Sequence, residues 1–590
     1  MNQPENFYNS QIEKYQSHLN LANRKLGFSS LLRLLVFLGI IYTIYHFWGN
    51  IQALIPLVLL GIGIFVLLVS RHADLKYDRN KYRELIKLNK LELQVLHRDF
   101  HHLPTGEEFE LPLHPYSQDV DLFGKGSFFQ YLNRSALFQG KMRLASLLLS
   151  NDTERIAQKQ ESIQELADKA DWRQNFAALA SLVKTRTNSE TILDWFSNYQ
   201  SFVPVIMKWL PWVFSAISVA VITAFFLDHL SAMQLLLWFI IGLGITGMYL
   251  KRINMLSESV SKIQDTFHQY HQLLALIEAT EFSSEILKEK KKLIHSKKEK
   301  TSEIIKKFSK AIDSLDQRNN MLFGVLGNGF LLWDLRQSFK LEKWIKAHGT
   351  KTKDWFDVIE FLDAYNSLGN FAFNHPSYAF PVINQETPIL KTQGLAHPLL
   401  DPQKRVANDF AIDKEQFYII TGANMAGKST FLRTVSLAIL MANTGLPVCA
   451  TSCAYTPIKL ITSMRTSDSL TDDESYFFSE LKRLKFIVDA IKKEKYFIIL
   501  DEILKGTNST DKAIGSRKFL EKLVGSRSTG IIATHDLSLC EVASELPQVD
   551  NYYFDAEIVN NELFFDYKFK EGICQNMNAS FLLKKMKIVD

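Results

Sequence analysis

The chain has 590 residues, which is too long for one hydrophobic core and predicts about three or four structural units. Its formal net charge of +5, from 68 basic and 63 acidic residues, excludes a uniformly basic nucleic-acid-binding protein and confines any basic surface to a local patch. The four cysteines show no CxxC pair and no zinc-finger spacing, so we expect reduced, structural thiols in a cytosolic setting.

The N-terminal region combines a polar segment with two apolar runs. Residues 1–30 lack the features of a secretory signal, and we expect them to stay on the protein as a cytosolic segment. Residues 34–48 and 51–70 are apolar on every face and contain no Asp, Glu, Lys or Arg, which a helix surrounded by water does not tolerate. Residues 31–70 are therefore predicted to form a transmembrane hairpin.

A second pair of apolar runs, at residues 209–227 and 232–250, predicts another hairpin within residues 204–250. Each run has 19 residues with aromatic side chains near its ends, as a membrane interface requires. Buried core helices are the alternative. However, four such runs in two close pairs, each near the length that crosses ~30 Å of hydrocarbon, favour four transmembrane helices in two hairpins.

Basic residues predict the orientation of both hairpins. The short loops at residues 49–50 and 228–231 contain no Lys or Arg. The outer ends are flanked by basic residues, namely Arg24, Lys25, Arg33, Arg71, Lys76, Arg79, Lys208, Lys251 and Arg252. Because such residues stay on the cytoplasmic side, we predict a multi-pass protein of the cell membrane, in contact with lipid, with its soluble domains on the cytosolic face.

The soluble segments next to the hairpins are predicted to be helical. Residues 71–203 contain a charged helix up to about residue 100 and a further helical pattern at residues 121–150. Residues 251–390 begin with a helical pattern over residues 259–315, which predicts a long helical hairpin or lever. Large apolar residues recur there at multiples of seven, at Leu287, Ile294, Phe308 and Leu315.

One segment of this lever is rich in lysine. Lys288–Lys310 carries ten lysines against Glu289, Glu299 and Glu303. Such a run is typical of a solvated helix face, and it also suits the phosphate oxygens of DNA or anionic lipid headgroups. We therefore keep DNA as a candidate partner through Lys288–Lys310.

The segment from residue 417 to residue 442 has the order strand, glycine-containing loop and helix, which is the setting of a phosphate-binding P-loop. In such a loop the backbone N–H groups face phosphate oxygens, Lys428 reaches the β- and γ-phosphates, and the Ser429 hydroxyl ligates Mg²⁺. The predicted nucleotide-binding residues are Gly422, Ala423, Asn424, Met425, Ala426, Gly427, Lys428, Ser429 and Thr430.

Two further apolar strands end in polar residues. Residues 496–500 lead to Asp501, which we expect to hold Mg²⁺, and to Glu502, which is suited to orient or deprotonate the attacking water. Residues 530–534 lead to His535, which we expect at the γ-phosphate. The pattern predicts an ATPase that uses ATP and Mg²⁺, with Glu502, His535 and Lys428 as its catalytic residues.

These motifs resemble those of the MutS family of DNA mismatch-repair ATPases. TGANMAGKSTFLRT is similar to the family's ATP-binding loop and DEILKGTNSTD to its metal-binding strand, and further similar motifs follow family order from residue 391 to about residue 540. The resemblance implies that residues 391–590 form an α/β P-loop NTPase domain of ABC/MutS type. It also implies a homodimer in which Ser475 of one subunit reaches the γ-phosphate bound by the other.

The sequence departs from the family pattern at several positions. Ala423 and Ala426 stand where the family usually has Pro and Gly, and Leu504 stands where Gly is usual, which implies slower hydrolysis with binding retained. Arg405 stands where an adenine-stacking aromatic is expected. Residues 1–70 leave no room for the family's mismatch-reading domain, so direct mismatch recognition is not expected.

The remaining helical segments resemble the family more weakly. Residues 122–149 and 255–385 are similar to its helical core and lever. The resemblance thus implies a membrane-anchored MutS-like ATPase that acts as a dimeric conformational switch on DNA or on an unknown protein partner. Two alternatives stay open: an ABC-type transporter or membrane mechanotransmitter, and an ATP-binding scaffold with slow turnover.

Overall fold

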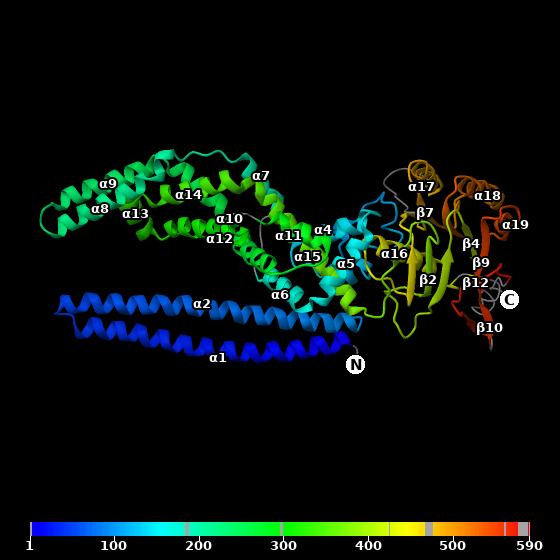
Figure 1. Ribbon diagram of the computed structural model, residues 1–590, viewed down its shortest axis with the longest axis horizontal. Helices are drawn as coiled ribbons and strands as arrows, with labels where there is room; N and C mark the ends of the chain where they lie inside the picture. The colour runs from blue at the N-terminus through cyan, green and yellow to red at the C-terminus, as the bar shows by residue number, and fades with distance from the viewer. Residues whose placement is uncertain are drawn as a thin grey trace.

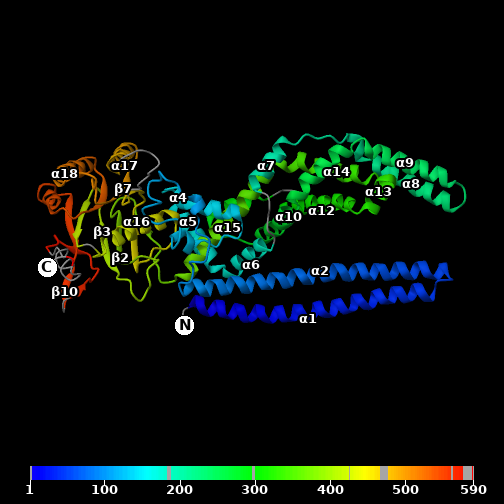
Figure 2. The same cartoon turned by 180° about the vertical axis from the view of Figure 1, so that it is seen from behind.

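The computed structural model describes residues 3–182, 188–295, 299–423, 425–465, 476–559, 562–575 and 588. The molecule is elongated, with an α/β unit at one end and two helical arms that extend to the opposite end (Figure 1). The same arrangement is seen from behind, where both arms again point away from the α/β unit (Figure 2). The two apolar regions of the sequence therefore lie at one end of the molecule, and the P-loop lies at the other.

The N-terminal arm consists of two long antiparallel helices, α1 (Gln3–His46) and α2 (Ile51–Leu96). The chain turns between them at Gly49–Asn50, where the Asn50 side chain accepts a hydrogen bond from the backbone N–H of Ala53 and caps α2. Residues 1–30 were expected as a separate cytosolic segment, but the described part of this segment is continuous with the first apolar run in one helix. The charged helix expected after residue 70 is confirmed as the second half of α2.

The outer half of this arm is apolar and bare, whereas its inner half is packed on protein. Leu35 and Leu60 in the outer half are 56% and 62% exposed, while Tyr8 and Leu85 in the inner half are buried. Among the described residues, α1 and α2 are the two helices that are long and apolar enough to cross a membrane on their own.

The second arm ends in shorter apolar helices than the sequence predicts. Its elements are α7 (Ser189–Asn198), η2 (Val205–Lys208), α8 (Leu210–Phe226), α9 (Ala232–Gly247) and α10 (Leu250–Ala279). α8 has 17 residues and α9 has 16, so each rises only ~24–26 Å, short of the ~30 Å hydrocarbon core. α9 reaches spanning length only together with α10, across a 63° bend. The expectation of four independent transmembrane helices is thus corrected to two long helices and one bent pair.

A third apolar helix that the sequence pattern did not reveal, α13 (Met321–Leu331), packs against α8 and α9. The contact with α9 depends on glycine, because a Cβ added to Gly242 would lie 2.1 Å from the carbonyl oxygen of Gly329. The outer face of α13 is left bare, with Met321 and Leu322 84% and 72% exposed. The second apolar tip is therefore made of three helices.

The predicted lever is confirmed as a helical hairpin. α10 packs along α12 (Thr301–Asp316), and α11 (Glu285–Leu293) lies between them in the chain. The chain then passes through η3 (Gln317–Asn319), α13, α14 (Trp333–His348) and η4 (Gly349–Lys351) into α15 (Thr352–Asn374). All four residues at multiples of seven, from Leu287 to Leu315, are buried.

The helical core between the arms and the α/β unit is organised around α15, which is buried along most of its length. Around it lie η1 (Glu107–Phe109), α3 (Phe128–Leu132), α4 (Phe138–Leu149), α5 (Ile156–Asp168) and α6 (Ala170–Ser181). Asp363 of α15 accepts the backbone N–H groups of Ala136 (3.1 Å) and Leu137 (2.9 Å) at the start of α4. Burial raises the pKa of this carboxyl to about 7.

The α/β unit is built on a six-stranded sheet of order β12-β9-β4-β8-β7-β6, in which all strands except β12 are parallel. The strands are β4 (Phe417–Gly422), β6 (Lys459–Ser463), β7 (Tyr496–Asp501), β8 (Thr529–Ala533), β9 (Val549–Phe554) and β12 (Lys570–Glu571). The three strands predicted at the P-loop, at Asp501 and before His535 are thereby confirmed.

Helices cover both faces of this sheet, and a smaller sheet lies beside it. The helices are α16 (Lys428–Thr444), α17 (Tyr476–Ile491), α18 (Ser509–Gly525), η5 (Leu537–Glu541) and α19 (Val542–Glu545). The smaller sheet has the order β1-β5-β2-β3, with β1 (Val382–Ile383), β2 (Leu390–Leu395), β3 (Asn408–Ile412) and β5 (Ser452–Tyr455). A hairpin of β10 (Glu557–Val559) and β11 (Glu562–Phe564) follows β9.

Candidate nucleotide site

The P-loop lies between the end of β4 and the start of α16, as the sequence predicts for this loop. Gly427 has φ +105°, a conformation that favours glycine, and a Cβ there would lie 3.0 Å from the ring of Tyr567. The Lys428 ammonium group is buried and donates to the carbonyl oxygens of Gly422 (2.7 Å) and Ala423 (3.1 Å). The lysine is thus held inside the curve of the loop, at the N-terminal end of α16.

The neighbouring parallel strands bring three further predicted residues to this loop. Because β8 and β7 follow β4 in the sheet, their carboxyl ends meet beside Lys428. The Ser429 hydroxyl donates to Asp501 Oδ2 at 2.7 Å. His535 Nε2 lies 2.8 Å from Glu502 Oε1 and 3.3 Å from Lys428 Nζ. Five residues assigned from sequence to nucleotide chemistry therefore form one contiguous cluster.

The electrostatics of this cluster favour a charged Glu502. The hydrogen bond from His535 lowers the pKa of Glu502 to about 2, against the opposing effect of partial burial. Burial lowers the pKa of Lys428, and the carboxylates of Asp501 and Glu502 oppose that shift. Glu502 is therefore a carboxylate throughout the physiological pH range, able to accept a hydrogen bond from a water molecule.

The oxygen donors at the loop fit a magnesium ion. Ser429 Oγ and Asp501 Oδ2 are hard ligands that lie within hydrogen-bonding distance of one another. Within the described ranges, no group of three or more His, Cys, Asp or Glu side chains could hold a metal by itself. Mg²⁺ typically uses one or two protein oxygens, as Ser429 and Asp501 offer here, and takes its other ligands from phosphate and water.

The loop after Asp501 is held by a buried carboxylate that the sequence analysis did not single out. Glu480 of α17 accepts the backbone N–H groups of Leu504 and Lys505 (3.0 Å to the latter). Both Glu502 and Leu504 have positive φ, +50° and +59°. Leu504 therefore occupies the left-handed conformation that glycine adopts more easily, which gives a physical reason for the family's usual glycine there.

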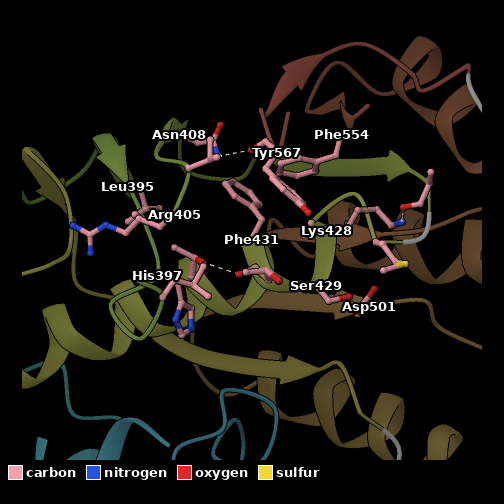
Figure 3. Close-up of a pocket in the computed structure, with 18 of the residues that line it drawn as sticks. Leu395, His397, Arg405, Asn408, Lys428, Ser429, Phe431, Asp501, Phe554 and Tyr567 are labelled. Atoms are coloured by element: carbon pink, nitrogen blue, oxygen red, sulfur yellow. Dashed lines mark hydrogen bonds between the residues drawn. The ribbon is translucent and has the colours of Figure 1, made fainter. Parts of the chain in front are cut away.

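The P-loop opens into a cavity of about 530 Å³. Lys428, Ser429 and Asp501 line one end and His397 and Arg405 the other, and three aromatic rings lie between them (Figure 3). These rings belong to Phe431, Phe554 and Tyr567. The size of the cavity and its aromatic lining suit a nucleotide with its phosphates at Lys428.

Two of the base-side residues differ from what the sequence indicated. Arg405 was considered as a stacking group for adenine, but its guanidinium donates to the Tyr378 hydroxyl at 3.2 Å. Tyr567 was not foreseen. Its turn is held by Asn408, whose amide donates to Tyr567 O (3.0 Å) and accepts from the Phe569 N–H (2.9 Å).

The other predicted binding residues take different positions. Met425 is 76% exposed at the rim of the cavity, whereas Ala426 is buried in the core under the loop. Thr430 lines the cavity from the first turn of α16. Asn424 and Ser475 lie outside the described residues. All four cysteines are free and buried, as expected for structural thiols.

Residues 418–587 match the family model described as MutS domain V. MutS domain V is an ATPase domain, which agrees with the clustered strand-end residues. MutS protein homolog 4 from Homo sapiens is 32% identical over 234 residues, which cover 38% of this chain and 24% of that protein. DNA mismatch repair protein MutS from Thermotoga maritima is 30% identical over 234 residues, covering 39% and 29%. The chain thus spans less than a third of the length of these relatives.

The lysine-rich segment is less open to phosphate than its composition indicates. Residues 296–298 lie outside the described part, and several of the described lysines form ion pairs within the protein. These pairs are Lys290–Asp357 (2.6 Å), Lys291–Glu281 (3.1 Å), Lys306–Glu303 (3.1 Å) and Lys307–Glu299 (2.5 Å). Asp357 and Glu281 lie outside the segment, so these two pairs reduce its excess of positive charge below what composition indicates.

Proposed function

We propose that this chain is a membrane-anchored ATPase of MutS type, which binds and hydrolyses Mg–ATP and works as a dimeric conformational switch. The observation that carries the proposal is the meeting of Lys428, Ser429, Asp501, Glu502 and His535 at the ends of three adjacent parallel strands. Phosphoryl transfer needs such positioning and charge stabilisation more than it needs covalent chemistry.

Each residue of the cluster has a distinct role in this proposal. Lys428 binds the β- and γ-phosphates, while Ser429 and Asp501 hold Mg²⁺, which neutralises phosphate charge when it is bound. Glu502 orients the attacking water and accepts its proton. His535, hydrogen-bonded to Glu502, keeps that carboxylate charged and lies where it can donate to the γ-phosphate.

The membrane part of the proposal rests on the two apolar tips. The outer halves of α1 and α2 are bare although they are apolar all round, and the tip formed by α8, α9 and α13 points in the same direction (Figures 1 and 2). Insertion of both tips into one bilayer would remove this surface from water. In the proposed homodimer, Ser475 completes the partner's site.

DNA is a weaker candidate partner. It is favoured by the name of the Thermotoga maritima relative, a DNA mismatch repair protein, and disfavoured by the internal ion pairs of Lys288–Lys310. A DNA complex held by this segment would weaken steeply with added salt, and binding with a flat salt dependence would exclude it.

The test uses the full chain purified in detergent. Lys428→Ala should abolish binding of a fluorescent ATP analogue, because the buried ammonium group is the main positive charge at the loop. Glu502→Gln should retain binding and lower phosphate release by about 10²–10⁴-fold. Lys493→Ala, at an exposed lysine before β7, is the matched control. Equal behaviour of the Lys428 and Glu502 variants would contradict these roles.

Membrane anchoring is tested separately by flotation of the wild-type protein with phospholipid vesicles. The protein should rise with the vesicles and stay with them in alkaline buffer. High pH releases proteins that are held at the membrane surface by charge, but it does not release proteins that are held in the bilayer by apolar helices. Recovery in the soluble fraction would refute the anchor and leave the ATPase proposal intact.

A further inference from the structure

The base of the N-terminal arm touches the wall of the nucleotide cavity through one side chain. Arg98 follows the end of α2 by two residues and has φ +67°, which turns the chain away from the helix axis. Its guanidinium donates through Nη1 to Pro398 O at 2.8 Å and through Nη2 to Leu400 O at 2.9 Å. The planar guanidinium group of Arg98 thus binds two carbonyl oxygens of one short loop.

This loop forms the side of the cavity that faces the P-loop. His397 and Leu400 line the cavity, and Asp401 starts the turn that brings Lys404 and Arg405 to the same wall. The backbone N–H groups of Lys404 (3.0 Å) and Arg405 (2.9 Å) both bond to Asp401 O. Figure 3 shows His397 and Arg405 at the end of the cavity opposite Lys428. Arg98 therefore fixes the start of the segment that closes the base side of the site.

The arm cannot shift at its base without moving Arg98. Glu92, in the last turns of α2, is buried and accepts hydrogen bonds from Arg134 Nε (2.6 Å), Asn370 Nδ2 (2.9 Å) and Asn374 Nδ2 (2.8 Å). The buried Tyr8 hydroxyl of α1 donates to Asn374 Oδ1 at 2.6 Å. One polar network thus locks both helices of the arm to α15, and breaking it would leave buried groups unpaired.

We propose that Arg98 is a positioning residue that couples the N-terminal arm to nucleotide binding. It touches neither the P-loop nor Asp501, Glu502 or His535, and it acts by holding the wall at residues 397–400 against the base and ribose. The coupling rests on the proposed ATPase function. Because linkage between two sites is reciprocal, the environment of the apolar tip changes nucleotide affinity, and bound nucleotide changes the arm.

The first experiment compares nucleotide affinity and turnover in the full chain. Arg98→Ala should weaken binding of a fluorescent ATP analogue by about 5–50-fold. Turnover at saturating ATP should stay within about threefold, because the reacting groups are untouched. The affinity of Arg98→Lys should lie between those of the wild type and Arg98→Ala, because a lysine ammonium group can bond to only one of the two carbonyl groups at a time. Lys90→Ala, an exposed position on the same helix, should match the wild type.

A merely structural role would give a different result. It would lower the melting temperature and the folded fraction while leaving the affinity of the folded protein unchanged, so binding is measured on the monodisperse fraction. Wild-type affinity in Arg98→Ala overturns the inference. Absence of binding in the wild type would instead overturn the proposed function, and the inference with it.

The second experiment tests the connection to the tip. Wild-type affinity is measured in detergent micelles and in phosphatidylethanolamine–phosphatidylglycerol vesicles, and it should differ by several-fold because the two environments constrain the arm differently. In Arg98→Ala the difference should vanish. An equal affinity in both environments for the wild type, or an unchanged difference in Arg98→Ala, would refute coupling through this residue.

Discussion

Helix α16 and the outer halves of α1 and α2 each contain a run of apolar residues, but the surroundings of these runs are opposite. Almost every residue of α16 is buried, under the sheet on one side and the helical core on the other. In the most apolar stretches of α1 and α2, 6% and 0% of the residues are buried. An apolar sequence therefore predicts that a helix is shielded from water. Whether protein or lipid surrounds it is decided by the elements that pack around it.

The largest effect should come from placing a charge in each of these helices. Leu437→Arg in α16 would bury an unpaired guanidinium, and we expect loss of about 4 kcal/mol or more of unfolding free energy, seen as insoluble protein or a collapsed thermal transition. Leu60→Arg in the bare half of α2 should leave the fold in detergent within about 0.5 kcal/mol.

The two variants should separate again in a membrane. Leu60→Arg should weaken flotation with vesicles, since an arginine at the middle of a bilayer costs about 2.5–3.5 kcal/mol. A melting transition that falls equally in both variants would show that protein, and not lipid, covers the tip.

A smaller effect is expected at the buried carboxylate of Glu480, beside the loop that follows Asp501. Glu480→Ala would leave the N–H groups of Leu504 and Lys505 without their acceptor, at about 1–3 kcal/mol each. Because Glu502 lies on the same loop, turnover should fall about 10–100-fold while nucleotide affinity changes little. Glu480→Gln, which keeps one acceptor, should recover part of the rate. Unchanged turnover in both variants would mean that the loop orders itself without Glu480.

The glycine contact in the second tip offers a matched pair on one helix. Gly242→Leu in α9 would collide with the backbone of α13, and overpacking of this kind costs about 1–3 kcal/mol. Gly244→Leu faces open space, with nothing within 4 Å of its added Cβ, and should be neutral. Hydrogen exchange of α13 in micelles measures the difference. Equal exchange in both variants would show that α13 does not depend on this packing.

The smallest effect concerns Asp363 of α15, in the helical core between the two ends of the molecule. Because burial raises the pKa of Asp363 to about 7, the folded state holds a proton that the unfolded chain has released above about pH 4. The contribution of Asp363 to the unfolding free energy, taken as the difference between the wild type and Asp363→Asn, should therefore fall as pH rises towards 7, by at most about 1.4 kcal/mol per pH unit. Urea melts of both proteins between pH 5.5 and 7 measure this slope. A difference that does not change with pH would assign the proton to another group.

Sequence alone located the residues of the candidate nucleotide site because the information that identifies them is local. Lys428, Asp501 and His535 can be placed together from local features once the sheet is known to be parallel. These features are a strand, the P-loop spacing and a polar residue at the end of each neighbouring strand. Tyr567 and Arg98 were not found, because their partners lie far away in the chain and their own neighbours carry no recognisable pattern. Glu480 was not singled out, although residues 475–481 resemble a family motif.

The apolar elements show the same limit. The apolar halves of α1 and α2 follow from composition, whereas the continuity of α1 through residues 3–30 was not predicted. α13 was missed because its 11 residues are too few to span a membrane. The lengths of α8 and α9 were overestimated because the hydropathy of a sequence does not show where a helix ends or bends. Periodicity did identify four buried residues of the lever: Leu287 and Ile294 in and directly after α11, and Phe308 and Leu315 in α12.

The continuous length of α2 sets how far the protein extends from the membrane. The helix has 46 residues and is ~69 Å long. With residues 51–70 in the bilayer, residues 71–96 extend ~39 Å from the lipid surface, and their inner part packs along the helical core. ATP would then be hydrolysed well clear of the headgroups, at the end of the molecule opposite the apolar tips (Figure 1).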